Sequence, residues 1–566
     1  MSLIGALNIG KSALAVSQAA IQVTGNNVAN AGNADYTRQV ANLSPNKDQQ
    51  IQQGIYVGTG VNLDSIQRQI DEALQSRIRS SVSDDEAAGT TQQWMGRIES
   101  LFNELTDQDL STQLSTFFNS WSDLANKPQD IGLRQVVIQN GDSLAQGVKD
   151  LYSQLGSLQS DVDDRTTALV GNADELASQI ANLNGQIVTA EGGGMGQANG
   201  LRDQRDAVLK QLAQLMDVKT ITHENGTLDV YVNSEPLVLG TDSRGVGFRT
   251  ETVNNKLETA VTIKQTDGAV KLTTGQLGAL QGVRDSIDSV MDKVNTLAQN
   301  IIFELNKIHS SGQGLEGLST TSSTNLVDQT DVALNSDQSG LDFKAQTGSF
   351  VVHVTNKLTG LSTSTLVQVD LDGANGNDTT LESLQAQLDG IAGITASISG
   401  GRLSIKSDSS DLQFSFSQDS SNTLAALGIN SFFSGTDAGD ISVSSTISGN
   451  PSLLAAAKNG EHGDNQTALQ IAALESAAVD GLGGASMKDT YEAMVNGVAT
   501  SSQSAKNNAD AASTIRQTLE AQREALSGVS LDEEAVNLIK QQRAFQGAAK
   551  LISTVNEMMQ TLLNMA

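Results

Sequence analysis

The sequence predicts an elongated α+β protein of several domains, in which both chain ends form a helical coiled-coil rod and β-rich domains are inserted in the middle. Three observations lead to this fold class. Large apolar residues recur every seven positions near each end, and the apolar period changes from 3.6 to 2 in two central regions. In addition, 566 residues are too many for a single hydrophobic core.

The N-terminal segment predicts a helix over residues 3–30. Its apolar residues alternate in steps of four and three, and Lys11 is the only charged side chain. The large heptad positions are Leu7, Leu14, Ile21 and Val28, whereas the positions between them are small. The Asn-Ala-Gly-Asn cluster at residues 30–33 then ends the helix, because Gly32 and asparagine favour the left-handed backbone of a helix C-terminus.

The C-terminal segment predicts a matching helix that starts at Ser530. Ser530-Leu-Asp-Glu533 has the pattern of a capping box, in which the hydroxyl and the carboxylate each accept from an unpaired backbone N–H group. The large residues that follow every seven positions are Leu531, Leu538, Phe545, Ile552 and Met559. The intervening seam positions are expected at Ala535, Gln542, Ala549, Asn556 and Leu563. Because both terminal seams carry little charge, we expect them to pack in an assembly of copies.

Four domains are predicted between and around these ends. Residues 1–60 with 510–566 form the terminal helical assembly domain. Apolar stripes at 144–187 and 280–308 indicate a helical rod domain built from residues 61–216, 276–316 and 465–509. Alternating apolar residues between turn signals predict a small β domain at 217–275 and a β-rich outer domain at 317–464.

The charge of the chain argues against several classes of partner. A formal net charge of −29 disfavours nucleic acid and anionic membranes, which require clustered lysine and arginine. The absence of cysteine excludes disulfides and cysteine-ligated zinc. No stretch has the basic-then-apolar pattern of a signal peptide, so we expect export by a route that keeps the N-terminus.

No residue pattern predicts catalysis, a cofactor or a metal ion. His223-Glu224 begins like a zinc-protease motif, but the fifth position is Thr227 and the segment reads as a hairpin. The run from Asp370 to Asp378 fails the ligand count of a calcium loop and reads as a solvated turn. Gly192–Gly196 lacks the spacing of a phosphate loop and reads as a helix connector. We therefore expect a protein that is not an enzyme.

Two short motifs resemble the terminal signatures of the bacterial flagellar axial proteins, the family of rod, hook and hook-associated subunits. At the N-terminal end the matching residues are Asn27, Asn30, Tyr36, Thr37 and Arg38. At the C-terminal end they lie in 527–545 and include Asp532, Glu533, Gln542 and Arg543. Asp35 stands where this family usually has glycine, so the turn before Tyr36 would need aspartate to tolerate a left-handed backbone.

The middle of the chain resembles the hook-associated members of this family. The shared elements are Leu201–Asp206, the segment from Leu297 to Gly312 with Asn306-Lys-Ile-His309, and Leu424–Phe433. The resemblance implies a structural adaptor of the hook–filament junction that assembles through its paired terminal helices. It also implies self-assembly into a ring, hook protein on one side, a second junction protein on the other, and an export chaperone at the C-terminal helix.

The same resemblance implies an extracellular location in the flagellum after type III export. Two alternatives stay open at this point. The chain could be a hook or rod subunit of the same family, or a secreted adhesin or enzyme on an axial-type frame.

Overall fold

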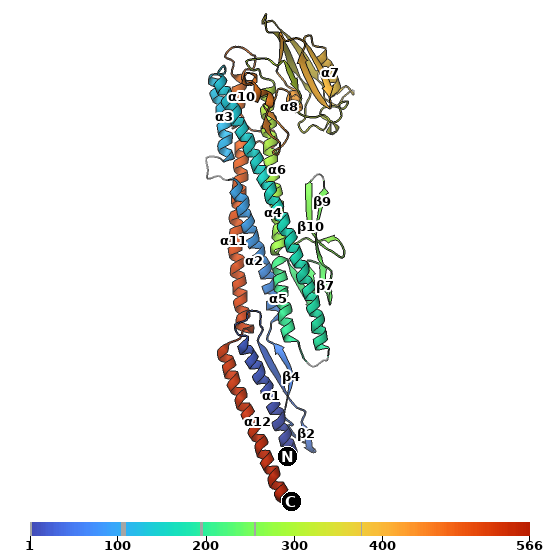
Figure 1. Cartoon of the computed structure of the whole chain (residues 1–566), viewed down its shortest axis with the longest axis vertical. Helices are drawn as coiled ribbons and strands as arrows, with labels where there is room; N and C mark the ends of the chain where they lie inside the picture. Colours follow the sequence, from blue (N-terminus) through green and yellow to red (C-terminus); the bar gives the residue numbers. More distant parts are fainter. Residues whose placement is uncertain (1–2, 103–108, 193–195, 254–255, 375, 566) are drawn as a thin grey trace. The chain divides into compact units, whose positions relative to one another are not determined.

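The computed structural model describes residues 3–102, 109–192, 196–253, 256–374 and 376–565 (Figure 1). The chain divides into two compact units. Unit 1 contains residues 1–94, 161–283 and 503–566, and unit 2 contains residues 95–160 and 284–502. Four long helices contribute residues to both units, namely α2 (Glu72–Phe102), α4 (Ile131–Glu191), α6 (Gly275–Ser310) and α11 (Met487–Ser527).

In unit 1 the two ends of the chain form a helical pair. Helix α1 (Leu3–Ala29) packs along α12 (Leu531–Met565), and the two described ends lie at the same end of the pair (Figure 1). The helices are antiparallel, because Asn27 contacts Glu534 at one end and Gly10 lies against Ile552 further along. This arrangement confirms the two predicted terminal helices.

Strands that the sequence did not predict follow α1. Strand β1 (Gln39–Pro45) pairs antiparallel with β4 (Val61–Arg68), with a register shift at Asn42/Leu43. Between them, β2 (Gln49–Gln52) and β3 (Ile55–Val57) form a separate hairpin. Helix α1 packs on β1 and β4, so its second neighbour besides α12 is this sheet.

The rest of unit 1 combines long helices with two small sheets. Helix α5 (Asn199–Leu215) follows α4. The first sheet has the order β5-β6-β7-β8, formed by Val218–Thr222, Leu228–Val232, Glu235–Leu239 and Asp242–Ser243. The second has the order β11-β10-β9, formed by Gly268–Ala269, Lys256–Ile263 and Val246–Val253. The hairpin from β5 to β6 contains His223, as predicted.

Unit 2 carries the remaining strands. Its two three-stranded sheets are β14-β13-β17 (Ser362–Val369, Gly348–Asn356, Leu412–Ser417) and β12-β16-β15 (Thr320–Ser322, Arg402–Ser407, Ile394–Ser399). A two-stranded sheet joins β18 (Phe433–Ser434) and β19 (Ser442–Val443). The helices are α3 (Leu110–Asn126), α7 (Leu381–Asp389), α8 (Thr423–Leu427), α9 (Ser445–Gly449) and α10 (Gln466–Ala473), with short 3-10 turns at Asp337–Ser339, Pro451–Leu453 and Asp480–Leu482.

Unit 2 contains a buried aromatic cluster. Trp121 and Phe117 of α3 contact Phe432, and the ring of His309 packs edge-on against both Trp121 and Phe432. Asn306 accepts from the backbone N–H groups of Phe432 and Phe433 and donates to the carbonyl of Phe433. Two of the shared family elements therefore bind each other directly.

His309 is completely buried and neutral. Its Nε2 accepts from the backbone N–H of Ala455 at 3.0 Å, so Nδ1 carries the hydrogen and donates to the carbonyl of Asn430 at 2.8 Å. Burial, together with the nearby Arg134 guanidinium, lowers the pKa of His309 to about 4.

The predicted fold class is confirmed, and so are the helices expected at 144–187 and 280–308, which lie in α4 and α6. The alternating segments around Phe350, Leu403 and Phe414 are strands β13, β16 and β17. The division into four domains with the stated boundaries stays a prediction. The Gly192–Gly196 connector lies largely outside the described residues. Among the helices that the structure describes, none combines the length and apolar character needed to cross a bilayer.

Candidate assembly site at the chain ends

The buried face of α1 consists mainly of small or polar residues. The buried positions are Gly10, Val16, Ser17, Ala20, Val23, Thr24 and Asn27. The large heptad residues Leu7, Leu14 and Ile21 are only half-buried, and Val28 is 41 % exposed. A Cβ on Gly10 would lie 2.8 Å from Cγ1 of Ile552, so glycine is needed there for the helices to approach closely. The predicted apolar stripe thus flanks the contact with α12 and keeps accessible surface.

On α12 the structure covers some of the predicted seam positions and exposes others. Leu538, Phe545, Ile552 and Met559 are half-buried, as a seam facing α1 requires. The intervening positions are wrong by one residue: Ala535, Gln542, Ala549, Asn556 and Leu563 are exposed, and Leu563 is 77 % exposed. The structure places Glu534, Gln541, Ala548 and Val555 there instead. Leu531 is 57 % exposed and lies outside the seam.

Outside the seam, α12 exposes several large apolar side chains. These are Val536 (66 %), Ile539 (54 %), Leu551 (39 %) and Met558 (46 %), together with Leu562 and Met565 near the end of the helix. Isolated exposed apolar residues are ordinary on a protein surface, but a series along one helix indicates a contact surface. The terminal pair therefore offers both a closed seam and an open apolar surface.

A buried asparagine joins the two chain ends. The amide of Asn27, 1 % exposed, donates to Oε2 of Glu534 at 3.1 Å and to the carbonyl of Gln39 at 2.9 Å. Its oxygen accepts from the Tyr36 hydroxyl at 2.7 Å and from the N–H of Gln39 at 3.0 Å. One side chain thereby connects α1, the turn after it and α12.

Arg38 forms the ionic part of the same contact. Its guanidinium bonds Oε1 of Glu534 at 2.8–2.9 Å and Oε2 of Glu533 at 2.8 Å, while its backbone N–H donates to the carbonyl of Ser527. The Glu534 side chain is 2 % exposed, whereas Glu533 is 62 % exposed. We call Asn27, Tyr36, Arg38 and Glu534 the terminal clasp, because they hold α1 and the start of α12 in a fixed register.

The cap of α12 differs from the predicted capping box. The Ser530 hydroxyl accepts from the N–H of Glu533 at 3.4 Å. The Glu533 carboxylate, however, accepts from Arg38 rather than closing the box. An ionic partner from the other end of the chain has replaced the local hydrogen bond.

The turn between α1 and β1 does not require glycine at residue 35. Asp35 is not among the described non-glycine residues with positive φ, and its N–H donates to Oδ1 of Asn33. Asn30 bonds back to Asn26 within the last turn of α1. Asp35 therefore replaces the family glycine without backbone strain.

The remaining family-motif residues have different environments. The N–H of Thr37 lies 3.5 Å from Oδ2 of Asp203 on α5. Asp532, Gln542 and Arg543 are exposed on α12. Contacts among the described residues do not account for their place in the signature, and a role in contacts between copies stays a prediction.

The charged residues of the Leu201–Asp206 element each have a partner. Arg68 of β4 bonds Asp203 at 2.9 Å and Asp206 at 2.6 Å. Arg202 forms two bonds of 2.8 Å with Glu191 of α4. This element therefore ties the sheet beneath α1 to the helices of unit 1. Burial raises the pKa of Asp203 despite Arg68, and burial followed by the Asp203 charge raises the pKa of Tyr36 to about 12.

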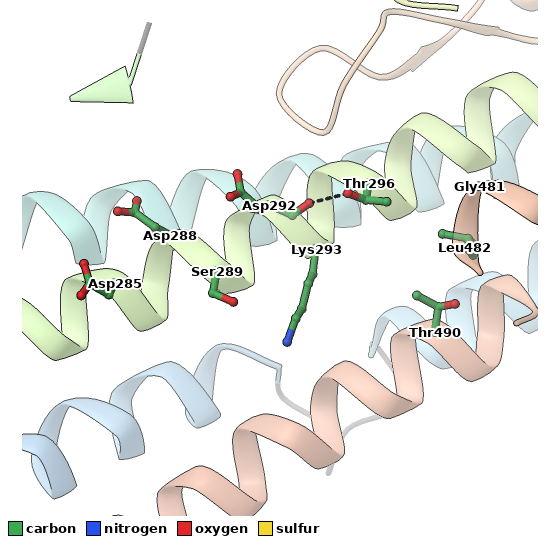
Figure 2. Close-up of a pocket in the computed structure, with 9 residues that line it drawn as sticks. All are labelled: Asp285, Asp288, Ser289, Asp292, Lys293, Thr296, Gly481, Leu482 and Thr490. Atoms are coloured by element: carbon green, nitrogen blue, oxygen red, sulfur yellow. Dashed lines mark hydrogen bonds between the residues drawn. The ribbon is translucent and has the colours of Figure 1, made fainter. Parts of the chain in front are cut away.

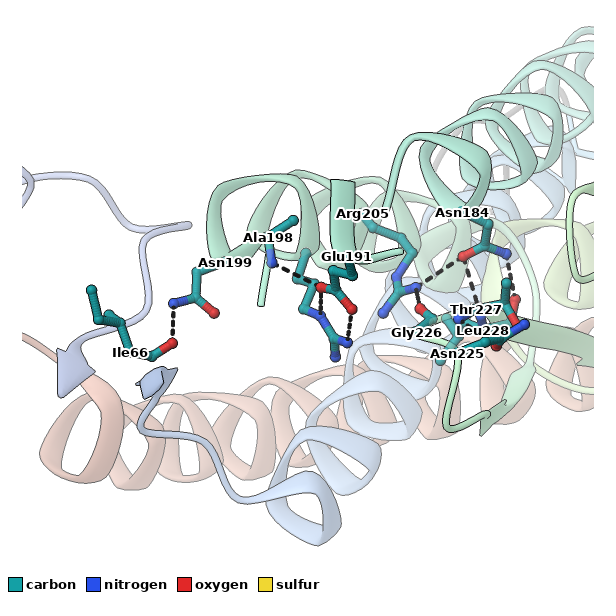
Figure 3. A network of polar contacts seen from close by, with 11 residues as sticks. Ile66, Asn184, Glu191, Ala198, Asn199, Arg205, Asn225, Gly226, Thr227 and Leu228 are labelled. Atoms are coloured by element: carbon teal, nitrogen blue, oxygen red, sulfur yellow. Dashed lines mark hydrogen bonds and ion pairs between the residues drawn. The ribbon is translucent and has the colours of Figure 1, made fainter. Parts of the chain in front are cut away.

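Figure 3 shows the continuation of this network. The buried guanidinium of Arg205 donates to Oδ1 of Asn184 and to the carbonyl of Gly226, in the β5–β6 turn. Asn184 also bonds Leu228, and Asn199 donates to the carbonyl of Ile66. The sequence motif included Arg205, but only the structure shows that Arg205 and Asn184 bind the β5–β6 turn to the helices.

The described pockets and clusters do not assemble recognisable catalytic chemistry. An open pocket of about 610 Å³ in unit 2 is lined by Asp285, Asp288, Ser289, Asp292, Lys293, Thr296, Gly481, Leu482 and Thr490 (Figure 2). Thr296 donates to the backbone carbonyl of Asp292 there, and histidine and cysteine are absent from these nine residues. The carboxylates of Asp370, Asp372 and Asp378 converge within 4.8 Å, closer than the predicted solvated turn suggested, but they bond loop amides.

Comparisons with known proteins agree with the terminal signatures. Residues 95–322 match the family model of the flagellar hook-associated protein FlgK helical domain, and residues 521–565 match that of the flagellar basal body rod FlgEFG protein C-terminal region. Flagellar hook-associated protein 1 of Escherichia coli is 24 % identical over 99 % of both chains, and that of Salmonella typhimurium is 24 % identical over 99 % of both. The Bacillus subtilis protein is 31 % identical over 39 % of this chain and 44 % of its own.

The fold comparison points the same way. The solved structure of the flagellar hook junction protein FlgK from Burkholderia pseudomallei matches 80 % of this chain and all of that chain, with a TM-score of 0.53 and 14 % identity. The chain is therefore similar over 99 % of its length to flagellar hook-associated protein 1, and these similarities support a structural role in the bacterial flagellum.

Proposed function

We propose that this chain is an adaptor subunit of the hook–filament junction and that it assembles through the terminal helical pair. The observation that carries the proposal is the asymmetry of that pair. The terminal clasp and the small-residue seam join α1 to α12 within one chain, while Val536, Ile539, Leu551 and Met558 stay exposed on α12. Contacts with neighbouring copies would bury these side chains, each worth roughly 1.5–3 kcal/mol when fully buried.

The predicted seam residues also contribute to this proposal. Leu7, Leu14, Ile21 and Val28 on α1, and Leu538, Phe545, Ile552 and Met559 on α12, keep part of their surface accessible. They would serve first in the contact within the chain and then in the walls of the assembled ring. In this ring the hook protein would lie on one side and a second junction protein on the other.

The proposal also states how the chain would be exported, where it would be located and whether it would act as an enzyme. The chain would be exported by the flagellar type III pathway, with a cytoplasmic chaperone covering the apolar surface of α12 until assembly. Its finished location would be extracellular, and it would act by binding rather than as an enzyme. A hook or rod subunit is the second candidate, favoured by the match of residues 521–565 to a rod-protein model.

The test uses substitutions on the exposed surface of α12. We expect Val536→Asp and Leu551→Asp to abolish filament attachment, so that cells build hooks but shed flagellin into the medium. Gln546→Asp, which places the same charge at another exposed position of α12, is the control and should leave filaments intact. The purified variants should melt like the wild type, because neither site is buried in the monomer.

Two results would contradict the proposal. If Val536→Asp assembles as well as Gln546→Asp, the exposed surface is not an assembly contact. Loss of hooks as well as filaments in null cells would instead identify a hook or rod subunit. Phe545→Asp extends the test to the seam: it should block incorporation while unit 2 stays folded, and melting of unit 2 would show that the seam is ordinary core.

A further inference from the structure

The β14 strand of unit 2 is the unprotected edge of its sheet. In the part of the chain that the structure describes, β14 pairs with β13 alone, in the sheet order β14-β13-β17. Its pairing with β13 runs from Ser362 to Val369 without a register shift. Residues 362–366 are all exposed, so helices or loops of the described chain do not cover this end of the strand. A regular edge of this kind is a template for another strand.

The other edges of the same two sheets are protected. Leu318 and Phe414 exchange two hydrogen bonds of 2.8 Å and so cover the outer edge of β17. On β15, the carbonyl of Ala396 accepts from Gln385 at 2.7 Å, and its N–H donates to Asp389 at 2.9 Å, both on α7. Strand β12 has only three residues. Of the four edges of these two sheets, β14 is the long one that the described residues leave without such cover.

Strand β14 also lacks the residues that usually prevent an edge strand from pairing with another chain. Residues 358–369, which include the turn before the strand, contain neither a charged residue nor proline, in a chain with a net charge of −29. Leu358 is 77 % exposed, Leu361 74 % and Leu366 55 %. Edge strands normally carry lysine, proline or a bulge to prevent pairing with another chain. Cross-strand neighbours on an added strand would cover part of the exposed surface of these leucines.

We propose that the edge of β14 pairs antiparallel with the β14 edge of a second copy of this chain. Charge favours this occupant. In a two-fold contact a charged residue near the axis would lie close to its own copy, and residues 358–369 avoid this repulsion completely.

The charges beyond the strand ends are complementary. An antiparallel arrangement brings the start of one β14 next to the end of the other. Exposed Lys357 lies in the turn before β14, where its Nζ donates to the carbonyl of Ser410 at 3.1 Å; released from that bond, it would extend towards the end where Asp370 and Asp372 follow β14 in the other copy. These carboxylates belong to the converging group with Asp378, so the lysine supplies charge of the opposite sign to an acidic group.

This contact is distinct from ring assembly. A two-fold contact is complete with two copies, whereas ring neighbours repeat one head-to-tail contact. It therefore acts on subunits outside the ring. Two eight-residue strands bury less than the roughly 1,200 Å² of a stable interface, so the dimer forms at high protein concentration and dissociates on dilution.

Site-specific cross-linking of the full-length chain tests the proposal. The chain contains no cysteine, so one introduced thiol reports one position. Ser364→Cys, Thr365→Cys and Leu366→Cys lie at the centre of β14 and should give covalent dimers with a short bismaleimide, increasingly with protein concentration. Ser397→Cys is the control, because it is exposed on β15, whose edge is protected.

Charge variants complete the test. Leu366→Lys placed in the Thr365→Cys chain should remove the cross-link, while Ser397→Lys should leave it unchanged. Lys357→Glu should weaken the cross-link, whereas Lys406→Glu, on the central strand β16, makes the same charge change and should have no effect. High salt should weaken the wild-type contact in the same sense as Lys357→Glu.

Three results would overturn the proposal: no dimer at residues 364–366, equal dimer at Ser397→Cys, or cross-links from β14 to a different protein alone. Adding Phe545→Asp separates this contact from the proposed function. The β14 cross-link should persist in that variant even where incorporation into the junction is lost, and its disappearance would assign the association to the terminal helices instead.

Discussion

Replacing Glu534 by glutamine should loosen the start of α12 far more than the same change at Glu533. Glu534→Gln removes a buried charge that bonds both Arg38 and Asn27. Hydrogen bonds to a charged group contribute about 1.5–3 kcal/mol. Because the Arg38 side chain is 15 % exposed and keeps Glu533 as a partner, we expect a cost near the lower end, about 2 kcal/mol.

Glu533, which bonds the same arginine as Glu534, provides the control. Glu533 bonds the same guanidinium but is 62 % exposed, so Glu533→Gln should cost less than about 1 kcal/mol. A loss of 2 kcal/mol raises the population of the locally open state about 30-fold. Amide hydrogen exchange of residues 535–541 in the monomer should therefore accelerate about 30-fold for Glu534→Gln and at most about fivefold for Glu533→Gln.

Two hydrogen-exchange results would refute this reasoning about the clasp. Equal exchange rates in the two variants would mean that burial does not determine the strength of this ion pair. Unchanged exchange in Glu534→Gln would mean that the clasp does not hold α12 in the monomer. Exchange in unit 2 provides the reference, since its residues do not form the clasp.

Three further predictions follow from other contacts. Asn27→Ala, which removes four hydrogen bonds, should lower the denaturation midpoint of unit 1 by more than Asn30→Ala, whose bonds stay within one exposed turn. Gly10→Val should destabilise the terminal pair by about 1–3 kcal/mol through collision with Ile552, whereas Gly25→Ala, with open space around it, should stabilise α1 by about 0.5–1 kcal/mol in urea denaturation. The pKa of His309 is about 4 in the folded chain and 6.5 ordinarily, so the unfolded chain binds the proton more readily and the free energy of unfolding should fall as the pH falls from 6.5 towards 4. The melting temperature of His309→Asn should therefore depend less on pH in that window. Equal slopes in the wild type and the variant would contradict a buried neutral histidine.

Periodicity predicted the helices because it is a local property. Residues such as Leu538 and Phe545 repeat at the spacing that one helix face requires, and the structure places them on that face. The same spacing assigned Ala535 to the seam, whereas the structure places Glu534 there. Glu534 is stable there because Arg38 and Asn27, some 500 residues away, supply its partners. A pattern within one segment does not contain that information.

The sequence marked part of the terminal clasp as a family motif, but it did not reveal the contacts among those residues. The signature residues Asn27, Tyr36 and Arg38 were recognised as a motif, and the structure shows that they bind one another and α12. Strands β1 and β4 were missed, because Val40, Leu43 and Ile66 alternate only weakly with polar residues in a sheet of two strands. The protection of β15 by α7 likewise depends on tertiary geometry.

The terminal clasp also has a consequence for the order of events during synthesis. Asn27 and Glu534 are 507 positions apart, so α1 leaves the ribosome long before its partner helix exists. Closing an unstructured loop of that length costs about 5 kcal/mol in chain entropy, more than the roughly 2 kcal/mol expected for the loss of the Glu534 charge. Folding of the intervening chain shortens this separation first. The register of α1 against α12 is therefore set among the last steps of maturation, and a nascent chain that stops before residue 534 keeps its first helix unmatched.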